Sequence, residues 1–262
     1  MQNIQSIGIV GAGQMGRGIA QVAAMSGYEV KIFDVSTEGL KKGVDFIQAQ
    51  LTKGIEKAKW DQVFVDSTMK KISAVSELTS FKDCDLLIEA ATENKAIKFD
   101  IFKKLDEVAK PGAILATNTS SISITEIAAV TKRPALVAGM HFMNPVPVMK
   151  LVEGIRGLET TDETFNTVAA VAEKMGKVFI RANDVPGFAV NRILMPMINE
   201  AVYALYEGVA SISDIDQAMK LGTNQPMGPL ELADFIGLDT CLAIMNVLHD
   251  GLGDTKYRPC PL

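Results

Sequence analysis

The sequence predicts an α/β protein: a doubly wound, mainly parallel sheet with a helical-hairpin insertion, followed by an all-helical C-terminal domain. Three observations support this. A strand runs directly into a glycine-rich loop at 7–16, short apolar strands then alternate with helical patterns, and strand patterns become scarce beyond about residue 185. Strands that alternate with helices are typical of parallel sheets covered on both faces. We therefore expect domains at 1–185 and 186–262.

The glycine loop is the most informative segment. A strand over 7–10 leads into Gly11, Gly13 and Gly16, and a helix is expected over 17–25. In a dinucleotide-binding turn of the Rossmann type, the first glycine permits the tight turn, the second lets the backbone approach a pyrophosphate, and the third lets helix and strand pack closely. The helix N-terminus then favours the negative charge of the pyrophosphate. A plain tight turn is the alternative, and the flanking elements argue against it.

Asp34 follows the next predicted strand, 29–33. A carboxylate there can accept hydrogen bonds from a ribose 2′-hydroxyl and would repel a 2′-phosphate. The three residues after it include no arginine to bind that phosphate, so the sequence favours NAD over NADP. Alternatively, Asp34 only ends the strand or caps the helix that begins near Glu38.

A long polar segment, 37–71, comes next. Apolar residues recur at three- and four-residue spacing from Leu40 to Ile55, and a second helix is expected from Asp61. This is long for a simple crossover and predicts a helical hairpin that projects from the sheet. Lysines decorate it, and a solvated face is their plain interpretation: Lys41, Lys42, Lys53, Lys57 and Lys59.

The remaining elements follow in alternation. Strands are expected at 71–75, 86–89, 114–117, 135–140 and 178–181, and helices at 96–108, 122–130 and 163–175. Beyond a turn at 184–187, helices are expected at 189–206, 212–221 and 230–248. So many apolar faces on a short helical domain predict that a second chain buries some of them.

Composition excludes several classes of protein. The 262 residues carry a net charge of -5 without a basic run, so no nucleic-acid partner is expected. The cysteines form no C-x-x-C pair, which indicates reduced thiols, and no metal site is predicted. The chain start has no charged region followed by an apolar one, and no apolar stretch reaches membrane-spanning length. We expect a cytoplasmic protein that does not bind membranes.

His141 is the first candidate for chemistry, because it follows the strand 135–140 at the carboxyl edge of the sheet, where ligands bind in open α/β folds. An imidazole can deliver a proton to a ketone as hydride arrives. Glu153 can hold the ring and stabilise the imidazolium, although spacing alone does not bring the two together. A satisfied strand-end histidine is the alternative, and His249 is expected to be an exposed residue at a helix end.

Two further polar features are candidates. Hydroxyls and an amide at 117–121 follow a buried strand, where they can bind nicotinamide ribose or a substrate oxygen and can also cap the next helix, and we expect both uses in this loop. Asn191 lies near the start of the first helix of the second domain. It faces either the interdomain cleft or solvent, as a surface amide.

Together these segments resemble the L-3-hydroxyacyl-CoA dehydrogenase family, most closely its bacterial members that act on 3-hydroxybutyryl-CoA. The resemblance covers essentially the whole chain, and several long matches in order are far more specific than a glycine loop. They are the loop with Gln14-Met15-Gly16, 89–94 with Lys98, 118–121, 141–153, and 184–188 with Asn191.

The resemblance implies reversible, NAD-linked interconversion of (S)-3-hydroxybutyryl-CoA and acetoacetyl-CoA. His141 matches the family's acid/base and Glu153 its orienting carboxylate, while Ser120 and Asn191 match residues that hold the substrate. The family's hairpin helps hold CoA, which assigns Lys53 and Lys57, four apart on one helix face, to the substrate's phosphates. NAD contacts are implied for Gly11, Gly13, Gln14, Met15, Gly16, Asp34, Glu93, Lys98, Asn118 and Asn144.

The chain also departs from the family. Members continue past the position of Leu262 with a stretch that packs in the helical domain and its dimer contact, so we expect that domain to be shortened and a homodimer through it to be weakened. Two rival functions stay open. A dehydrogenase of free hydroxy acids or sugar acids would ignore CoA, and a non-catalytic NAD-binding or structural protein would bind NADH without turnover.

Overall fold

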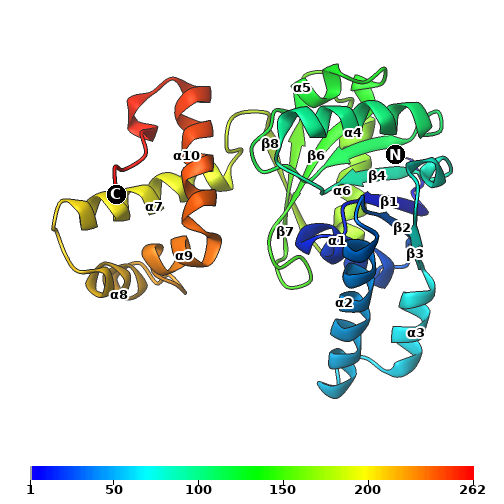
Figure 1. The fold of residues 1–262 in the computed structure, drawn as a ribbon, viewed down its shortest axis with the longest axis horizontal. Helices are drawn as coiled ribbons and strands as arrows, with labels where there is room; N and C mark the ends of the chain where they lie inside the picture. Colours follow the sequence, from blue (N-terminus) through cyan, green and yellow to red (C-terminus); the bar gives the residue numbers. More distant parts are fainter. Residues whose placement is uncertain (1) are drawn as a thin grey trace. The chain divides into compact units, whose positions relative to one another are not determined.

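The computed structural model describes residues 2–262 (Figure 1). The chain separates into two compact units, Met1–Asp184 and Val185–Leu262, and each is described by itself. The described part of the first unit contains an eight-stranded sheet in the order β3-β2-β1-β4-β5-β6-β7-β8. Its strands are β1 Ser6–Val10, β2 Glu29–Phe33, β3 Ile72–Val75, β4 Leu86–Glu89, β5 Ile114–Thr117, β6 Val137–Phe142, β7 Leu151–Arg156 and β8 Val178–Asn183.

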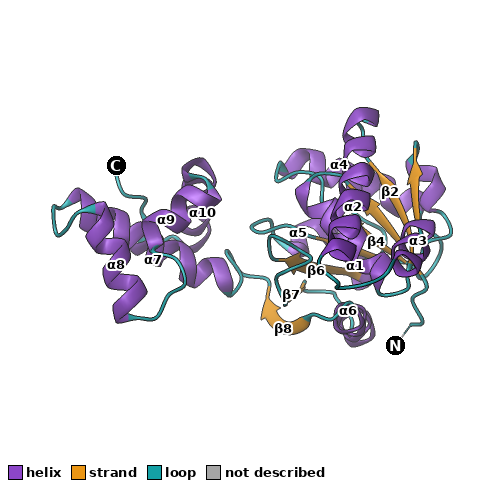
Figure 2. Ribbon diagram, turned by 90° about the horizontal axis from the view of Figure 1, so that it is seen from below, coloured by secondary structure: helices purple, strands orange, loops and turns teal. Residues whose placement is uncertain are grey.

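The strand order reverses between β1 and β4, which are parallel neighbours. Such a switch point leaves a crevice outside the carboxyl ends of the strands, where α/β proteins bind ligands. The predicted doubly wound, mainly parallel sheet is confirmed. Helices lie against both sides of the strands (Figure 2), and those of this unit are α1 Gln14–Met25, α2 Thr37–Glu56, α3 Gln62–Lys70, α4 Lys95–Val108, α5 Ile124–Ala129, α6 Asp162–Lys174, and the short 3₁₀ helices η1 Leu78–Phe81 and η2 Pro134–Leu136.

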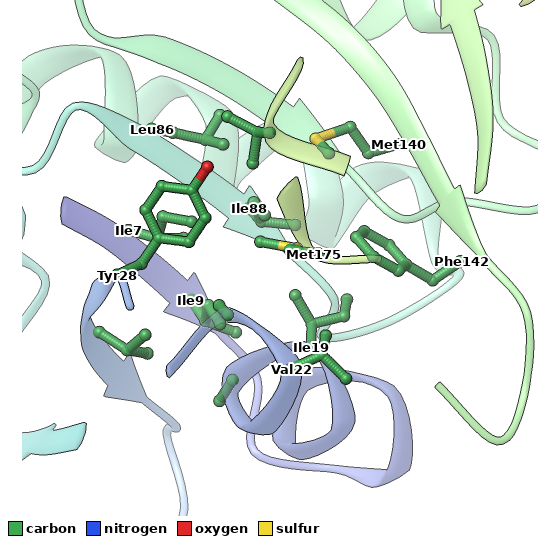
Figure 3. Close-up of a cluster of buried hydrophobic side chains, with 14 of the residues drawn as sticks. Ile7, Ile9, Ile19, Val22, Tyr28, Leu86, Ile88, Met140, Phe142 and Met175 are labelled. Carbon is green, nitrogen blue, oxygen red and sulfur yellow. The ribbon is translucent and has the colours of Figure 1, made fainter. Parts of the chain in front are cut away.

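The main core lies between the sheet and the helices α1 and α6. Figure 3 shows Ile9 and Ile88 of the central strands against Ile19 and Val22 of α1, with Phe142 of β6 nearby. Alternate residues of a strand point to opposite faces, so His141, next to Phe142, points to the other face of the sheet. Since Phe142 is buried in the main core, His141, on the other face, is the one of these two side chains that can take part in chemistry.

The predicted hairpin is formed by α2 and α3, which extend away from the sheet (Figure 1). Asp61 begins α3 by accepting a hydrogen bond from the backbone N–H of Phe64 at 2.8 Å. Trp60, in the turn, donates its indole N–H to the carbonyl of Leu51 at 2.7 Å. The indole hydrogen bond therefore ties the turn of the hairpin back to α2.

Strand β7 was not predicted, and β6 lies two residues further along the chain than expected, because it begins at Val137 and runs through His141 to Phe142. β7 pairs with β6 in the antiparallel sense. Its sequence includes Glu153 and Gly154, both unusual in a strand interior. Both are buried here, and a ring carbon of Phe179 lies 1.8 Å from the position that a Cβ on Gly154 would occupy. The glycine thus makes room for an aromatic ring, which the sequence pattern alone does not reveal.

The second unit is helical, with α7 Val190–Tyr206, α8 Ile212–Gly222, α9 Pro229–Ile236, α10 Leu238–Leu252 and the 3₁₀ helix η3 Thr255–Tyr257. The prediction of one helix over 230–248 was wrong, because Gly237 adopts φ +102° and the chain turns by 99° between α9 and α10. Among the described residues no single helix is long and apolar enough to cross a membrane. The bent pair α9 and α10 meets that length and composition test only jointly, and Ile244 and Leu248 of α10 pack in this unit's core.

Candidate active site

The glycine loop has the shape that a dinucleotide requires. Gly11 adopts φ +100°, and a Cβ there would lie 2.6 Å from the carbonyl oxygen of Ala90. A Cβ on Gly16 would lie 1.8 Å from the carbonyl oxygen of Gly11, whereas one on Gly13 would meet nothing within 4 Å. Gly13 precedes α1 without a side-chain cap, so the helix N-terminus faces open space. These residues fit a pyrophosphate, whose charge the helix N-terminus stabilises.

Asp34 lies against this loop. Its carboxylate accepts the backbone N–H of Ala12 at 2.7 Å and that of Ser36 at 2.9 Å. The hydroxyl of Ser36, and not Asp34, caps α2 by accepting from Gly39 N at 3.0 Å. The capping alternative for Asp34 is therefore wrong. Its carboxylate oxygens retain lone pairs that can accept from a ribose hydroxyl.

The loop after β5 is held by Glu93. One oxygen of that carboxylate, Oε1, accepts from the hydroxyl of Thr119 at 2.7 Å, and from the backbone N–H of Ser120 at 2.6 Å and its hydroxyl at 2.9 Å. Lys98 lies behind it, fully buried, in an ion pair with Glu89. Lys98 therefore reaches this loop through Glu93. Ser120 does not cap the following helix α5, because that position belongs to Ser123.

Two asparagine side chains join neighbouring loops at the same edge of the sheet. The amide oxygen of Asn118 accepts the backbone N–H of Phe142 at 2.8 Å, which ties the end of β5 to the end of β6. Asn144, in the loop after β6, accepts from the side-chain amide of Gln14 at 2.9 Å. These contacts bring the glycine loop and the residues beside His141 together. Met15, also predicted to contact NAD, packs partly buried against the main core.

His141 and Glu153 form the centre of the site. They are direct partners across the antiparallel pair β6 and β7, and Nδ1 of the imidazole lies 2.7 Å from Oε2 of the carboxylate. His141 is 8% exposed and Glu153 is fully buried. Because an ionised carboxylate only accepts hydrogen bonds, Nδ1 carries the proton in the neutral ring and Nε2 bears the lone pair. The pair can accept a proton at Nε2 and return it.

Lys177 is a residue that the sequence did not single out. Its ammonium donates to the carbonyl of Val146 at 2.5 Å and to that of Met149 at 2.9 Å, and so fixes the loop after His141. Burial lowers the pKa of this lysine below its ordinary value. The carbonyls that Lys177 contacts lie in a loop distant in sequence. The residues around position 177 therefore carry no pattern from which this role could be predicted.

A cavity of about 910 Å³ opens between α1, the hairpin and the loop after β6. Lys53 and Lys57, both predicted to bind substrate phosphates, line it together with the rings of Phe46, Trp60 and Phe64. Its lining, as far as the chain is described, includes no acidic residue. Its cationic residues are Arg17, Lys53, Lys57, Lys59, Lys150, Lys174 and Lys177. A cavity with aromatic walls and this excess of positive charge suits a nucleotide that carries several phosphates.

Asn191 belongs to the second unit, in the first turn of α7. It is 7% exposed, so the interpretation as an exposed surface amide is wrong. His249, in the last turn of α10, is partly exposed and lies 3.2 Å from Asp250. Within residues 2–262, no group of three or more His, Cys, Asp or Glu side chains is arranged to hold a metal ion.

The Rossmann sheet, the glycine loop with Asp34 and the His–Glu pair at the carboxyl edge define a nicotinamide-dependent dehydrogenase. Family models make this specific. Residues 6–185 match the model described as 3-hydroxyacyl-CoA dehydrogenase, NAD binding domain, and residues 187–262 match the C-terminal domain of the same family. The chain belongs to the 3-hydroxyacyl-CoA dehydrogenase family, and it is an NAD-dependent enzyme.

Individual proteins agree with this assignment. A protein of Bacillus subtilis named probable 3-hydroxybutyryl-CoA dehydrogenase is 58% identical over 99% of this chain and 90% of its own length. The crystal structure of (S)-3-hydroxybutyryl-CoA dehydrogenase from Ralstonia eutropha is 50% identical, with a TM-score of 0.96 over 98% of this chain and 91% of that one. An Escherichia coli protein named 3-hydroxyadipyl-CoA dehydrogenase is 43% identical over 93% of this chain and 51% of its own length.

Proposed function

We propose that this enzyme interconverts (S)-3-hydroxybutyryl-CoA and acetoacetyl-CoA by hydride transfer, with His141 as the acid/base. The hydrogen bond of 2.7 Å between His141 and the buried Glu153 is the observation that supports this most directly. It supplies an oriented imidazole on the strand that leads to the nucleotide edge of the sheet. The names of the most similar relatives supply the substrate class.

The protein's part in the reaction is the movement of one proton. Bound NAD supplies the hydride acceptor, and NADH the donor, at C3 of the acyl chain. In the direction of oxidation, Nε2 of His141 takes the proton of the C3 hydroxyl; in reduction it returns that proton to the C3 oxygen. Glu153 fixes the tautomer in which Nε2 carries the lone pair, and it stabilises the ring while the ring is protonated. The buried position of both groups strengthens that interaction.

Ser120 and Asn191 are proposed to hold the substrate near its reacting oxygen and thioester. The hydrogen bonds between Ser120 and Glu93 support the role proposed for Ser120. They fix its hydroxyl in the loop after β5, and Asn118 ties that same loop to the end of β6. Asn191 is assigned by the resemblance of its segment. With it, the second unit is proposed to be a substrate and dimerisation domain.

The basic cavity is proposed to bind the nucleotide part of CoA. Lys53, in the last turn of α2, and Lys57, the residue that caps the C-terminus of that helix, line the cavity beside the Trp60 ring. Lysine provides point charges for phosphate groups, and an aromatic ring provides a surface on which a base can stack. This cavity favours a CoA ester over a free hydroxy acid, because a free acid has no group to occupy it.

Nicotinamide absorbance tests the proposal directly. The enzyme is expected to oxidise NADH with acetoacetyl-CoA, and to be far slower with acetoacetate or with NADPH. Equal rates with acetoacetate would favour the free-acid dehydrogenase, and NADH binding without turnover would favour a non-catalytic protein. Including 3-oxoadipyl-CoA asks whether a dicarboxylic acyl chain, as in the name of the Escherichia coli relative, is accepted.

The homodimer and the cytoplasmic location stay predictions. Several large apolar side chains of the second unit are exposed, among them Ile193 at 73%, Val209 at 71% and Leu221 at 84%. Exposed apolar area of this kind is commonly covered by another chain. Sedimentation equilibrium of the purified protein measures whether these helices pair, and a monomer at micromolar concentration would contradict the dimer.

A further inference from the structure

A charged pair is buried beneath the loops that carry the proposed site. Glu89 and Lys98 are both fully buried and ion-paired, at the carboxyl end of β4 and in the second turn of α4. Burying two charges costs more desolvation than two apolar residues of the same volume would. The pair therefore calls for an explanation other than core stability.

The carboxylate of Glu89 joins three elements. Oε2 accepts the hydroxyl of Thr117, the last residue of β5, at 2.8 Å, as well as contacting Lys98 of α4. Oε1 accepts the backbone N–H of Ala91 at 2.9 Å, in the loop after β4. That loop packs against the glycine loop, since a Cβ on Gly11 would lie 2.6 Å from the Ala90 carbonyl oxygen. Every hydrogen bond to this carboxylate thus comes from a segment beside the nucleotide edge.

Lys98 also lies near a second carboxylate. Its Nζ is 3.7 Å from Oε2 of Glu93, too far for a hydrogen bond but within range of an ion pair. The other oxygen of Glu93 holds the backbone N–H and the hydroxyl of Ser120. The carboxylate of Glu93 therefore interacts with two groups at once. Its Oε2 lies near the buried ammonium of Lys98, and its Oε1 accepts hydrogen bonds from Ser120.

We propose that Glu89 is a positioning residue for the reaction, which holds Lys98 and so leaves Glu93 to hold Ser120. This rests on the proposed function in one respect, the role of Ser120 at the substrate. If Glu89 becomes an amide, its single carbonyl oxygen replaces two acceptor oxygens, while four donors still face it, from Ala91, Thr92, Lys98 and Thr117. Glu93 is then the nearest carboxylate left for Lys98, and moving toward the ammonium breaks its bonds to Ser120.

The experiment follows amide hydrogen exchange over residues 118–122 together with kcat/KM for acetoacetyl-CoA. In Glu89→Gln, exchange at the Ser120 amide should rise by about tenfold or more, the effect of losing a hydrogen bond to a charged acceptor. The misplaced loop should lower kcat/KM by about tenfold or more. Unchanged exchange at Ser120 in folded Glu89→Gln would overturn the proposal.

A matched control separates positioning from loss of stability. Asp106, near the other end of α4, is buried and paired with Arg133 at 2.6 Å, far along the helix from the loop of Ser120. Asp106→Asn therefore breaks an ion pair of the same helix whose carboxylate is also buried. It should lower the unfolding temperature while leaving exchange at 118–122 and kcat/KM of the folded enzyme unchanged. A rise in exchange equal to that of Glu89→Gln would mean that general loosening is the cause.

The double variant Glu89→Gln with Lys98→Met gives the sharpest test. Without the ammonium nothing draws Glu93 away, so protection of the Ser120 amide should return close to the wild-type value. A purely structural role for Glu89 predicts instead that the Ser120 amide of the double variant exchanges much faster than that of the wild-type protein. Such fast exchange in the folded double variant would overturn the proposal even if Glu89→Gln alone fails to fold. Exchange requires no turnover, so failure of the proposed activity in the unmodified enzyme is seen separately.

Discussion

His141 and Glu153 lie directly opposite each other on antiparallel strands, with Nδ1 and Oε2 2.7 Å apart. Twelve residues separate them in sequence, and the register of β6 and β7 brings them together on the face of the sheet away from Phe142 and Val152, which are in the main core. The pair is thus placed by backbone hydrogen bonds. Both residues belong to the first unit, and the first two predictions depend on the hydrogen bond between them.

Replacing the imidazole should abolish proton transfer without affecting the fold. His141→Gln keeps a polar side chain of similar size, and kcat for NADH oxidation with acetoacetyl-CoA is expected to fall by about 10²- to 10⁴-fold. NADH binding, followed by its fluorescence, should stay within about twofold, because the glycine loop is untouched. His249→Gln, in the second unit, is the control with normal kcat. Equal rates for His141→Gln and the unmodified enzyme would disprove the acid/base role.

Replacing the carboxylate should act through the tautomer of the ring. In Glu153→Gln the side-chain amide can donate to Nδ1, which moves the ring proton to Nε2 and removes the lone pair that faces the substrate. The kcat is expected to fall by about 10²- to 10⁴-fold, as for an amide in place of a triad carboxylate. The double variant with His141→Gln should be no slower than His141→Gln alone. Additive losses would mean that Glu153 acts independently of the ring.

The basic cavity predicts a loss that depends on the substrate's phosphates. Lys53→Ala or Lys57→Ala should raise KM for acetoacetyl-CoA by about fivefold each, an effect of about 1 kcal/mol that weakens as salt is added. KM for acetoacetyl-pantetheine, which has no phosphate, should not change. Lys41→Ala is the control, since Lys41 pairs with Asp45 and does not line the cavity. A similar KM increase with both substrates would remove the cavity from CoA binding.

Asp34 predicts the choice between the two nicotinamide cofactors. Asp34→Asn removes the charge that repels a 2′-phosphate, so the ratio of kcat/KM for NADPH to that for NADH should rise by about tenfold. Initial rates with each cofactor at saturating acetoacetyl-CoA give that ratio. Asp45→Asn, on the exposed face of α2, should leave it unchanged. An unaltered ratio in Asp34→Asn would show that other groups select NAD.

Asp85 predicts how stability depends on pH. Burial raises the pKa of this carboxyl, but hydrogen bonds from Lys110, Gln5 and Ser6 outweigh it and lower the pKa from 3.8 to about 2. A lowered folded-state pKa stabilises the folded chain above the unfolded value, and this is lost as pH falls through the folded one. Asp85→Asn should therefore cost about 2 kcal/mol of unfolding free energy at neutral pH.

Urea titration at several pH values measures this difference. The difference between the unmodified protein and Asp85→Asn should be full above pH 3.8 and shrink as the pH falls toward about 2. Asp83→Asn is the control, because Asp83 is exposed and its replacement should change stability by less than about 0.5 kcal/mol. A difference that does not vary with pH would contradict this account.

The features that could be predicted from the sequence are those that depend on residues close together in the chain. The glycine loop, Asp34 at a strand end and the apolar spacing of α2 each carry their signal in neighbouring residues, and the fold class followed from them. Strand β7 and the break at Gly237 were missed, because a buried Glu153 and a positive φ depend on packing from elsewhere in the chain.

The same reason applies within the candidate site. His141 and Glu153 were named as possible partners, but only a strand register shows their contact. Lys177 gave no signal at all, since the carbonyls that it binds lie 31 and 28 residues away. Long-range hydrogen bonds are set by tertiary structure, and a pattern of neighbours does not record them.

Because strand register places the His141–Glu153 pair, the pair is sensitive to misalignment of β7 during folding. Side chains alternate along a strand, so a slip of β7 by one residue would turn Glu153 to the opposite face and bring a neighbour beside the imidazole. Such a misaligned molecule would retain its helices and most of its sheet, yet it would transfer no proton. Spectra that report only secondary structure would count it as native, whereas titration of active sites would not.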